Sequence, residues 1–157
     1  MKPIKLVITF LCLVSLQTFS QNQAKPIKYE ALIKRFYGSV VNNVHMVPKP
    51  IGTIIKIDVD RLGKIAGIQL SDSADPDFMK QFEQQKKTLD FDALNRYVKA
   101  NNLSNISLLI PYYVTDKKNP NASHGKGRKL KQFENKDITG KTIMLDPIEI
   151  VFSIAKR

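Results

Sequence analysis

The chain carries few side chains that could do chemistry, and their spacing assembles no reactive site. His45 and His124 are the only histidines, and neither has a cysteine or an acidic cluster nearby at ligand spacing, whereas a zinc site needs about three or four such ligands. Asp58 and Asp60 precede a glycine as in a calcium loop, but no terminal glutamate completes the oxygen ligands. We therefore expect no metal and no other cofactor.

Two further patterns could support catalysis and are incomplete. The segment His124–Lys129 has the glycines and cations that approach a phosphate, yet it lacks the Walker spacing and the Ser or Thr that follows the lysine. Ser104, Ser107 and Ser123 stand outside any G-x-S-x-G motif and have no identifiable base. The sequence therefore predicts a protein that is not an enzyme; carboxylates that only folding would pair are the alternative.

The first twenty residues have the order of a secretory signal. Lys2 and Lys5 precede an apolar stretch over residues 6–19, and a polar run follows; this stretch is shorter than the roughly 20 residues that cross a bilayer as a helix. Thr18 and Ser20 provide the small residues of a cleavage site. We expect export, cleavage near Ser20-Gln21 and a periplasmic or secreted product without an integral membrane span; a retained anchor is the alternative.

The part of the chain after the signal is expected to be one domain. Cys12 is the only cysteine and lies inside the signal, so the exported part has neither a disulfide nor a thiol nucleophile. Residues 21–28 are expected to be a short linker and residues 29–157 a single domain. Removing Lys2 and Lys5 lowers the formal net charge from +11 to +9, which favours acidic partners, including polyanions, anionic lipid surfaces and acidic protein faces.

Periodic patterns predict the elements of this domain. Apolar residues repeat at helical steps from Tyr29 to Val44, and they alternate as in strands over Ile51–Val59 and Ala66–Leu70. Residues 60–64 contain a glycine and join the two strands, so a hairpin is expected.

The next elements follow from capping signals. Asp75-Pro76 marks the start of a helix over residues 76–87, and Thr88 or Asp90 caps another short helix that ends at Asn101-Asn102. Ile106–Val114 is rich in Ile, Leu and Tyr and predicts a buried strand, in which Pro111 indicates an edge position or a bulge.

The remaining sequence predicts a long basic loop and a last strand. Residues 116–142 carry eight basic side chains against three acidic ones, and Ile148–Ile154 alternates again. The expected fold class is α+β, a small antiparallel sheet packed against two or three helices in the order α-β-β-α-α-β, long loop, β.

The central stretch IGTIIKIDVDRLGKIAGIQLSDSADPDF resembles the C-terminal domain of TonB and its relatives, which are periplasmic modules of Gram-negative envelopes. The resemblance covers residues 29–114 and rests on a glycine-opened strand, an Asp before a glycine turn, a second strand and a serine-containing loop. The matching positions are Gly52, Ile55, Ile57, Val59, Asp60, Gly63, Ile65, Ile68, Leu70 and Ser71. The family's Tyr-Pro pair after the first helix and its proline-rich spacer are missing. The resemblance implies a divergent, stand-alone envelope domain that binds a partner.

Two binding functions are therefore expected. In the first, a non-enzymatic module pairs an exposed strand edge, residues 107–114 or 148–154, with an extended segment of an envelope protein. In the alternative, the basic loop over residues 117–141 binds a polyanion or an anionic surface; nucleic acid is not expected. The candidate contact residues are Lys117, Lys118, Lys126, Arg128, Lys129 and Lys131.

Overall fold

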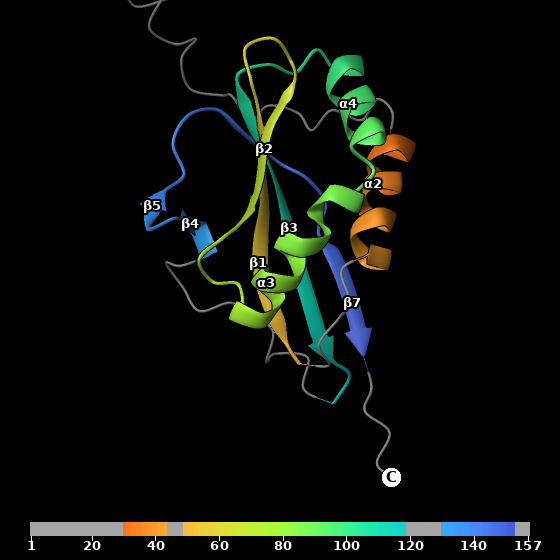
Figure 1. The fold of residues 1–157 in the computed structure, drawn as a ribbon, viewed down its shortest axis with the longest axis vertical. Helices are drawn as coiled ribbons and strands as arrows, with labels where there is room; N and C mark the ends of the chain where they lie inside the picture. Colours follow the sequence, from red (N-terminus) through yellow and green to blue (C-terminus); the bar gives the residue numbers. More distant parts are fainter. Residues whose placement is uncertain (1–29, 44–48, 119–129, 153–157) are drawn as a thin grey trace, which may run out of the picture.

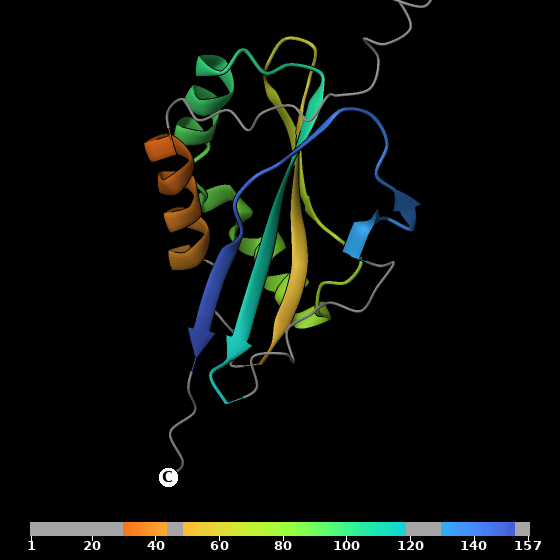
Figure 2. The same ribbon diagram turned by 180° about the vertical axis from the view of Figure 1, so that it is seen from behind.

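The fold has two layers, a mixed β-sheet and a set of helices that covers one of its faces. The computed structural model describes residues 30–43, 49–118 and 130–152. These residues form three α-helices and a five-stranded sheet. In Figure 1, α3 (Pro76–Gln85) lies in front of the strands and α2 (Glu30–Asn43) and α4 (Phe91–Ala100) lie to its right, and Figure 2 shows the strands in front of α3. The predicted α+β class is confirmed.

The first two strands form the predicted hairpin. β1 (Ile51–Val59) pairs antiparallel with β2 (Ile65–Leu70). Between them the Asp60 carboxylate accepts the backbone N–H groups of Leu62 at 2.8 Å and Lys64 at 2.9 Å. Gly63 adopts a φ of +72°, the left-handed region that favours glycine. The hairpin turn is therefore built by the aspartate and the glycine of the sequence pattern.

β3 (Ile106–Asp116) is the central strand of the sheet, so the expectation that its edge is exposed is wrong. β1 pairs antiparallel with one side of β3, whereas β6 (Thr142–Met144) and β7 (Ile148–Phe152) pair parallel with the other side. The sheet order is β2-β1-β3-β6, with β7 also on β3. The sheet is thus mixed, not purely antiparallel as expected.

Pro111 is tolerated in a central strand because it lies where one neighbouring strand ends and the next begins. Its partner on β1 is Ile54, whose N–H and C=O are bonded to Ser71 and so point away from β3. The Pro111 nitrogen therefore points away from β1, toward the interval between β6, which ends opposite Leu109, and β7, which begins opposite Tyr112. No ladder hydrogen bond is lost at the proline.

The helices follow the predicted capping signals. The Asp75 carboxylate caps α3 by accepting two backbone N–H groups of its first turn, and the Asp90 carboxylate caps α4 by accepting the N–H of Ala93. Among the described residues, no helix is both long and apolar enough to span a membrane. The elements are α2 (Glu30–Asn43), α3 (Pro76–Gln85), the 3₁₀ helix η1 (Lys86–Thr88) and α4 (Phe91–Ala100).

The main core lies between the helices and the sheet. Alternate residues of β1 and β3 face the helices, and the largest fully buried side chains come from both layers. Phe78 of α3 stacks on Tyr112 of β3 with ring centroids 5.1 Å apart, and Phe36 of α2 contacts Phe91 of α4 at 6.3 Å. Aromatic contacts thus join α3 to the sheet and α2 to α4.

The stretch over residues 116–142, expected to be a loop, contains a short hairpin. β4 (Gln132–Phe133) pairs antiparallel with β5 (Lys136–Asp137), and β6 begins at the end of this stretch. Phe133 is buried against Ile54 and Leu109 on the sheet face opposite the helices. The connection therefore provides a second, smaller core while it returns the chain to the start of β3.

Candidate functional site

A groove of the surface lies between the edge strand β2 and the helix α4. It encloses about 1060 Å³ and is lined by the β1–β2 turn, by β2, by α4 and by the residues that follow α4. A groove of this size falls in the range, or slightly above it, that small ligands and short peptide segments occupy. One wall is a strand and the other a helix (Figure 1).

The strand wall presents backbone groups that no described strand pairs. β2 is the last strand on its side of the sheet. The N–H and C=O of Ile54 on β1 point toward the β2 side, where both bond to Ser71. Backbone groups alternate in direction along a strand, so those of Lys56 also point toward β2 and pair with Gln69. The N–H and C=O of Ile68, which precedes Gln69, therefore point away from β1, on the side of the groove that Ile68 lines. Such an edge accepts a further strand.

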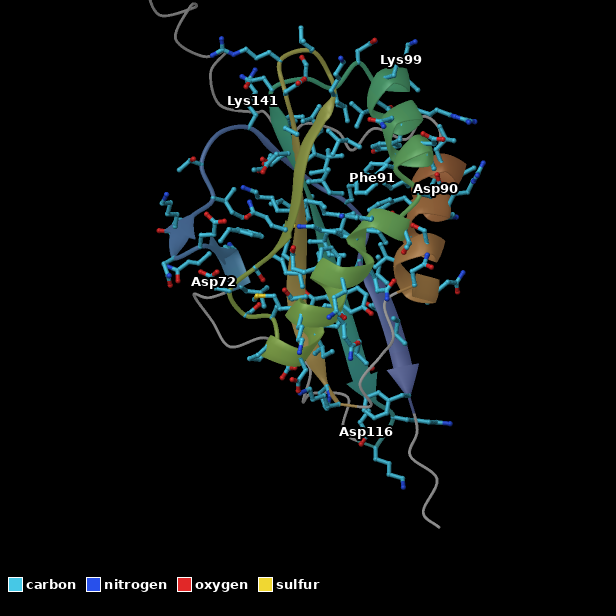
Figure 3. The ribbon with its side chains drawn as sticks, viewed as in Figure 1. Asp72, Asp90, Phe91, Lys99, Asp116 and Lys141 are labelled. Atoms are coloured by element: carbon cyan, nitrogen blue, oxygen red, sulfur yellow. The ribbon has the colours of Figure 1, made fainter. Side chains whose placement is uncertain are left out.

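The helix wall is a stripe of residues spaced by four. Phe91, Asn95 and Lys99 lie on one side of α4 and line the groove, because residues four apart share a helix face. Phe91 is partly buried and packs on the main core, whereas Lys99 stands exposed at the far end of the helix (Figure 3). The stripe thus changes from apolar to charged along the groove.

The turn end of the groove is held to the residues after α4. The Asp60 carbonyl accepts the N–H of Asn105 at 2.8 Å, and a Cβ at Gly63 would lie only 3.1 Å from the carbonyl oxygen of Leu103. Leu103 is itself fixed by its N–H, which donates to Val98 at 3.0 Å. These contacts hold the β1–β2 turn and the residues after α4 in a fixed arrangement at this end of the groove.

The charge of the groove is positive. Arg61 and Lys64 on the turn and Lys99 on α4 line it, and no acidic residue does within the described ranges. All three cations are exposed, and none forms an ion pair with a described carboxylate. The apolar floor consists of Ile65, Ile68, Phe91 and Leu103.

The structure does not gather the predicted contact residues into this site. Lys117 and Lys118 are exposed just after β3, and Lys131 is exposed just before β4. Of the two predicted strand edges, only β7 lies at an outer position of the sheet. Three of the predicted residues lie outside the described part of the chain: Lys126, Arg128 and Lys129.

Sequence reasoning missed the groove because its walls belong to different local patterns. The signal that could have found it is the four-residue spacing of Phe91, Asn95 and Lys99, which starts at a residue that packs on the core and continues over two exposed residues of α4. A short neighbouring strand that contains Gly67 is typical of a sheet edge.

No metal centre is formed by the described residues, which contain no group of three or more His, Cys, Asp or Glu placed to hold an ion. His45 and His124 lie outside the described ranges. Comparison with models of protein families, with curated proteins and with solved structures found no match. The groove between β2 and α4 is therefore the feature on which a function can be based.

Proposed function

We propose that the protein is a non-enzymatic binding module that takes an extended segment of a partner protein along the outer edge of β2, in the groove beside α4. The observation that supports this proposal is that one groove has the open edge of strand β2 on one side and the helix α4 on the other. Main-chain hydrogen bonds to such an edge give affinity, and a wall beside it contacts alternate side chains of the added strand.

β2 is favoured over β7 as the receiving edge because of this second wall. Both edges carry partly buried apolar side chains that pack on the main core, Ile65 and Ile68 on β2 and Ile150 and Phe152 on β7. Only those of β2 also line a groove with a helix as its second wall. An added strand would complete their burial, which stabilises the complex by the hydrophobic effect.

The compartment and the partner class belong to the same proposal. The charged, apolar and polar order of the first residues supports export, and the resemblance of residues 29–114 to the C-terminal domain of TonB supports an envelope protein as partner. Fractionation of the source cells and N-terminal sequencing of the product test export. A product that starts near Gln21 is expected, and a cytoplasmic product that retains Met1 would contradict it.

The experiment for strand addition uses peptides selected from a random display library against the full chain. We expect a selected peptide to shift the amide resonances of Ile65–Leu70 and Phe91–Lys99. Methylating the peptide nitrogen at alternate positions should abolish binding in one register and leave it in the other, because only alternate amides face β2. Shifts confined to β7 would contradict the choice of edge.

A matched pair of variants separates the backbone from the side chain. Ile68→Pro removes the outward N–H of an edge strand, where proline is tolerated, and Ile68→Ala removes the apolar side chain but keeps the donor. Proline should weaken binding well beyond alanine. Equal effects of the two substitutions would show that the backbone of β2 takes no part.

The alternative proposal is polyanion or anionic-surface binding by the stretch over residues 117–141, supported by its eight basic residues and by the exposure of Lys117, Lys118 and Lys131. Replacing Lys126, Arg128, Lys129 and Lys131 with Ser should then reduce retention on heparin or lipopolysaccharide several-fold. Unchanged retention would exclude this alternative.

A further inference from the structure

We infer that the groove selects a partner segment of defined chemistry and direction: alternating apolar residues that run antiparallel to β2, followed on their C-terminal side by acidic residues. This inference rests on the proposed function and adds the class of segment that the groove recognises. It is carried by the distribution of charged and apolar side chains along the groove.

The cations are concentrated at one end of the groove. Arg61 and Lys64 belong to the β1–β2 turn, and Lys99 lies in the last turn of α4, which is at the same end of the molecule (Figures 1 and 3). Elsewhere on the surface several cations are paired, as in Lys49 with Asp75 at 2.8 Å and Lys34 with Glu30 at 2.9 Å. Arg61, Lys64 and Lys99 have no such partner among the described residues, so the turn end is an open site for carboxylates.

Farther from the turn, the groove is apolar. Ile68 directs its side chain to the same sheet face as the buried Ile57, its partner on β1. A partner residue opposite Ile68 in an added strand would place its own side chain on this face, beside Phe91. Residues two positions away would return to this face, and those between would point to the other one. The floor thus selects apolar residues at alternate positions.

The direction of the segment follows from the direction of β2. This strand runs away from the cationic turn, from Ile65 to Leu70. Antiparallel pairing is the more stable arrangement per residue, and it brings the C-terminal end of the added segment to the turn. The acidic residues are therefore expected after the apolar ones.

Three amidated peptides test this inference against the full chain by fluorescence anisotropy. In the first, Thr and Val alternate and Asp-Glu follows; the second has the reversed sequence; the third ends in Lys-Lys. The first peptide should bind most tightly, and its affinity should fall as salt is added, because exposed charges are screened. Tighter binding of the reversed peptide would overturn the direction, and equal binding of all three would overturn the acidic preference.

Charge reversal provides the second arm. Lys99→Glu should weaken the acidic peptide about threefold to tenfold and strengthen the Lys-Lys peptide, since rim charges contribute modest energies. Lys80→Glu makes the same change in net charge at an exposed position of α3 that does not line the groove, and should leave both affinities unchanged. Equal effects of the two variants would overturn the site of recognition.

Failure of the inference and failure of the proposed function give different results. If peptides of any charge shift the resonances of Ile65–Leu70, strand addition holds and only the selectivity is wrong. If no peptide shifts them, and Ile68→Pro changes nothing, strand addition at β2 is itself rejected.

Discussion

At the scale of single residues, the buried hydroxyl of Tyr112 lowers the stability of the fold. Its side chain is fully buried against Phe78, and its hydroxyl has no hydrogen-bond partner among the described residues. Burial raises the pKa of Tyr112 to about 12. The folded protein holds this proton more tightly than the unfolded chain does. The ionisation of Tyr112 therefore leaves the stability unchanged below about pH 10 and lowers it as pH rises toward about 12.

We expect Tyr112→Phe to increase the free energy of unfolding by about 1 kcal/mol at neutral pH, since the substitution removes an unsatisfied hydroxyl and keeps the ring. The difference from the unmodified protein should widen between about pH 9 and about pH 11. Urea unfolding at the two pH values measures both effects. An equal loss of stability in both proteins at high pH would show that other groups, such as Tyr37, whose pKa is also raised by burial, account for it.

Ser71 has the opposite role, because its hydroxyl satisfies the edge of β1 that β2 leaves open. Its Oγ accepts the N–H of Ile54 at 3.0 Å and lies 2.9 Å from the hydroxyl of Thr53 and 2.8 Å from that of Ser73. Ser73 donates its only hydroxyl proton to the carbonyl of Gly52 at 3.0 Å, so it must accept from Ser71, and Ser71 must accept from Thr53. The chain of hydroxyls is therefore fully directed.

Ser71→Ala should lower the free energy of unfolding by about 2 to 3 kcal/mol, because it leaves the buried N–H of Ile54 without an acceptor. Ser104→Ala, at an exposed position, serves as the control and should change stability by less than about 0.5 kcal/mol. Thermal and chemical unfolding of the two variants measure the difference. A cost for Ser71→Ala no larger than the control's would contradict the directed chain.

At the scale of elements, the hairpin of β4 and β5 depends on one carboxylate from outside it. Asp72 accepts the N–H groups of Glu134 at 2.9 Å and Asn135 at 2.7 Å, and its own N–H donates to Gln132 at 2.8 Å. Both turn residues have positive φ, 53° and 61°, as in a type I′ turn. The left-handed region disfavours glutamate by about 1 kcal/mol.

We expect Glu134→Gly to raise stability by up to about 1 kcal/mol, and Asp72→Ala to release the hairpin. Hydrogen exchange is the measurement for the second variant: the amides of Glu134 and Asn135 should lose protection, while those of β1 and β3 keep theirs. Global loss of protection after Asp72→Ala would contradict a local role for the carboxylate.

The elements from residue 30 to residue 116 could be predicted because each has a local signal. The alternation of β1 and β3, the glycine turn and the aspartate caps all depend on residues a few positions apart. The parallel direction of β6 and β7 could not be predicted, because it depends on the end of β3 at which the long connection brings the chain back to the sheet. Leu130, Phe133 and Ile138 are separated in the sequence by polar and charged residues, and folding brings them together on the sheet face opposite the helices.

Pro111 and the groove illustrate the same limit. Proline predicts an edge only if a strand keeps one neighbour on each side along its whole length, whereas β3 changes neighbours at this residue. The groove joins Arg61 and Lys64 to Lys99, which are distant in sequence and come from a turn and a helix. From its neighbours in the sequence alone, each of these residues is predicted to be an ordinary exposed cation.

At the scale of the whole molecule, β7 is part of the core as well as an edge. Ile148 is buried, and Ile150 and Phe152 pack on the main cluster. Deleting Ile148–Arg157 should therefore leave a chain that is largely unfolded at 25 °C, since burial of each large apolar side chain contributes about 1.5 to 3 kcal/mol to a total stability of about 5 to 15 kcal/mol.

Circular dichroism and the elution volume on gel filtration measure this loss of structure. Val151→Lys is the matched control, because Val151 is 64% exposed and lies on the sheet face opposite the core; this variant should remain folded. A folded truncated chain would contradict the core role of β7 and would make truncation a usable test of strand capture.

The parallel pairing of β6 and β7 with β3 also affects the order in which the strands pair during folding. The contacts of β1 with β2 join neighbouring segments, whereas β7 reaches β3 only after the chain has travelled back along the sheet, with Ile148 opposite Tyr112. Contacts between distant segments form slowly, because the loop must close before they stabilise anything. Until then the far side of β3 stands uncovered, with Tyr112 and Val114 beside it. We therefore expect β7 to pair late in folding, and before it pairs, β3 offers an unpaired strand edge to which other chains can bind.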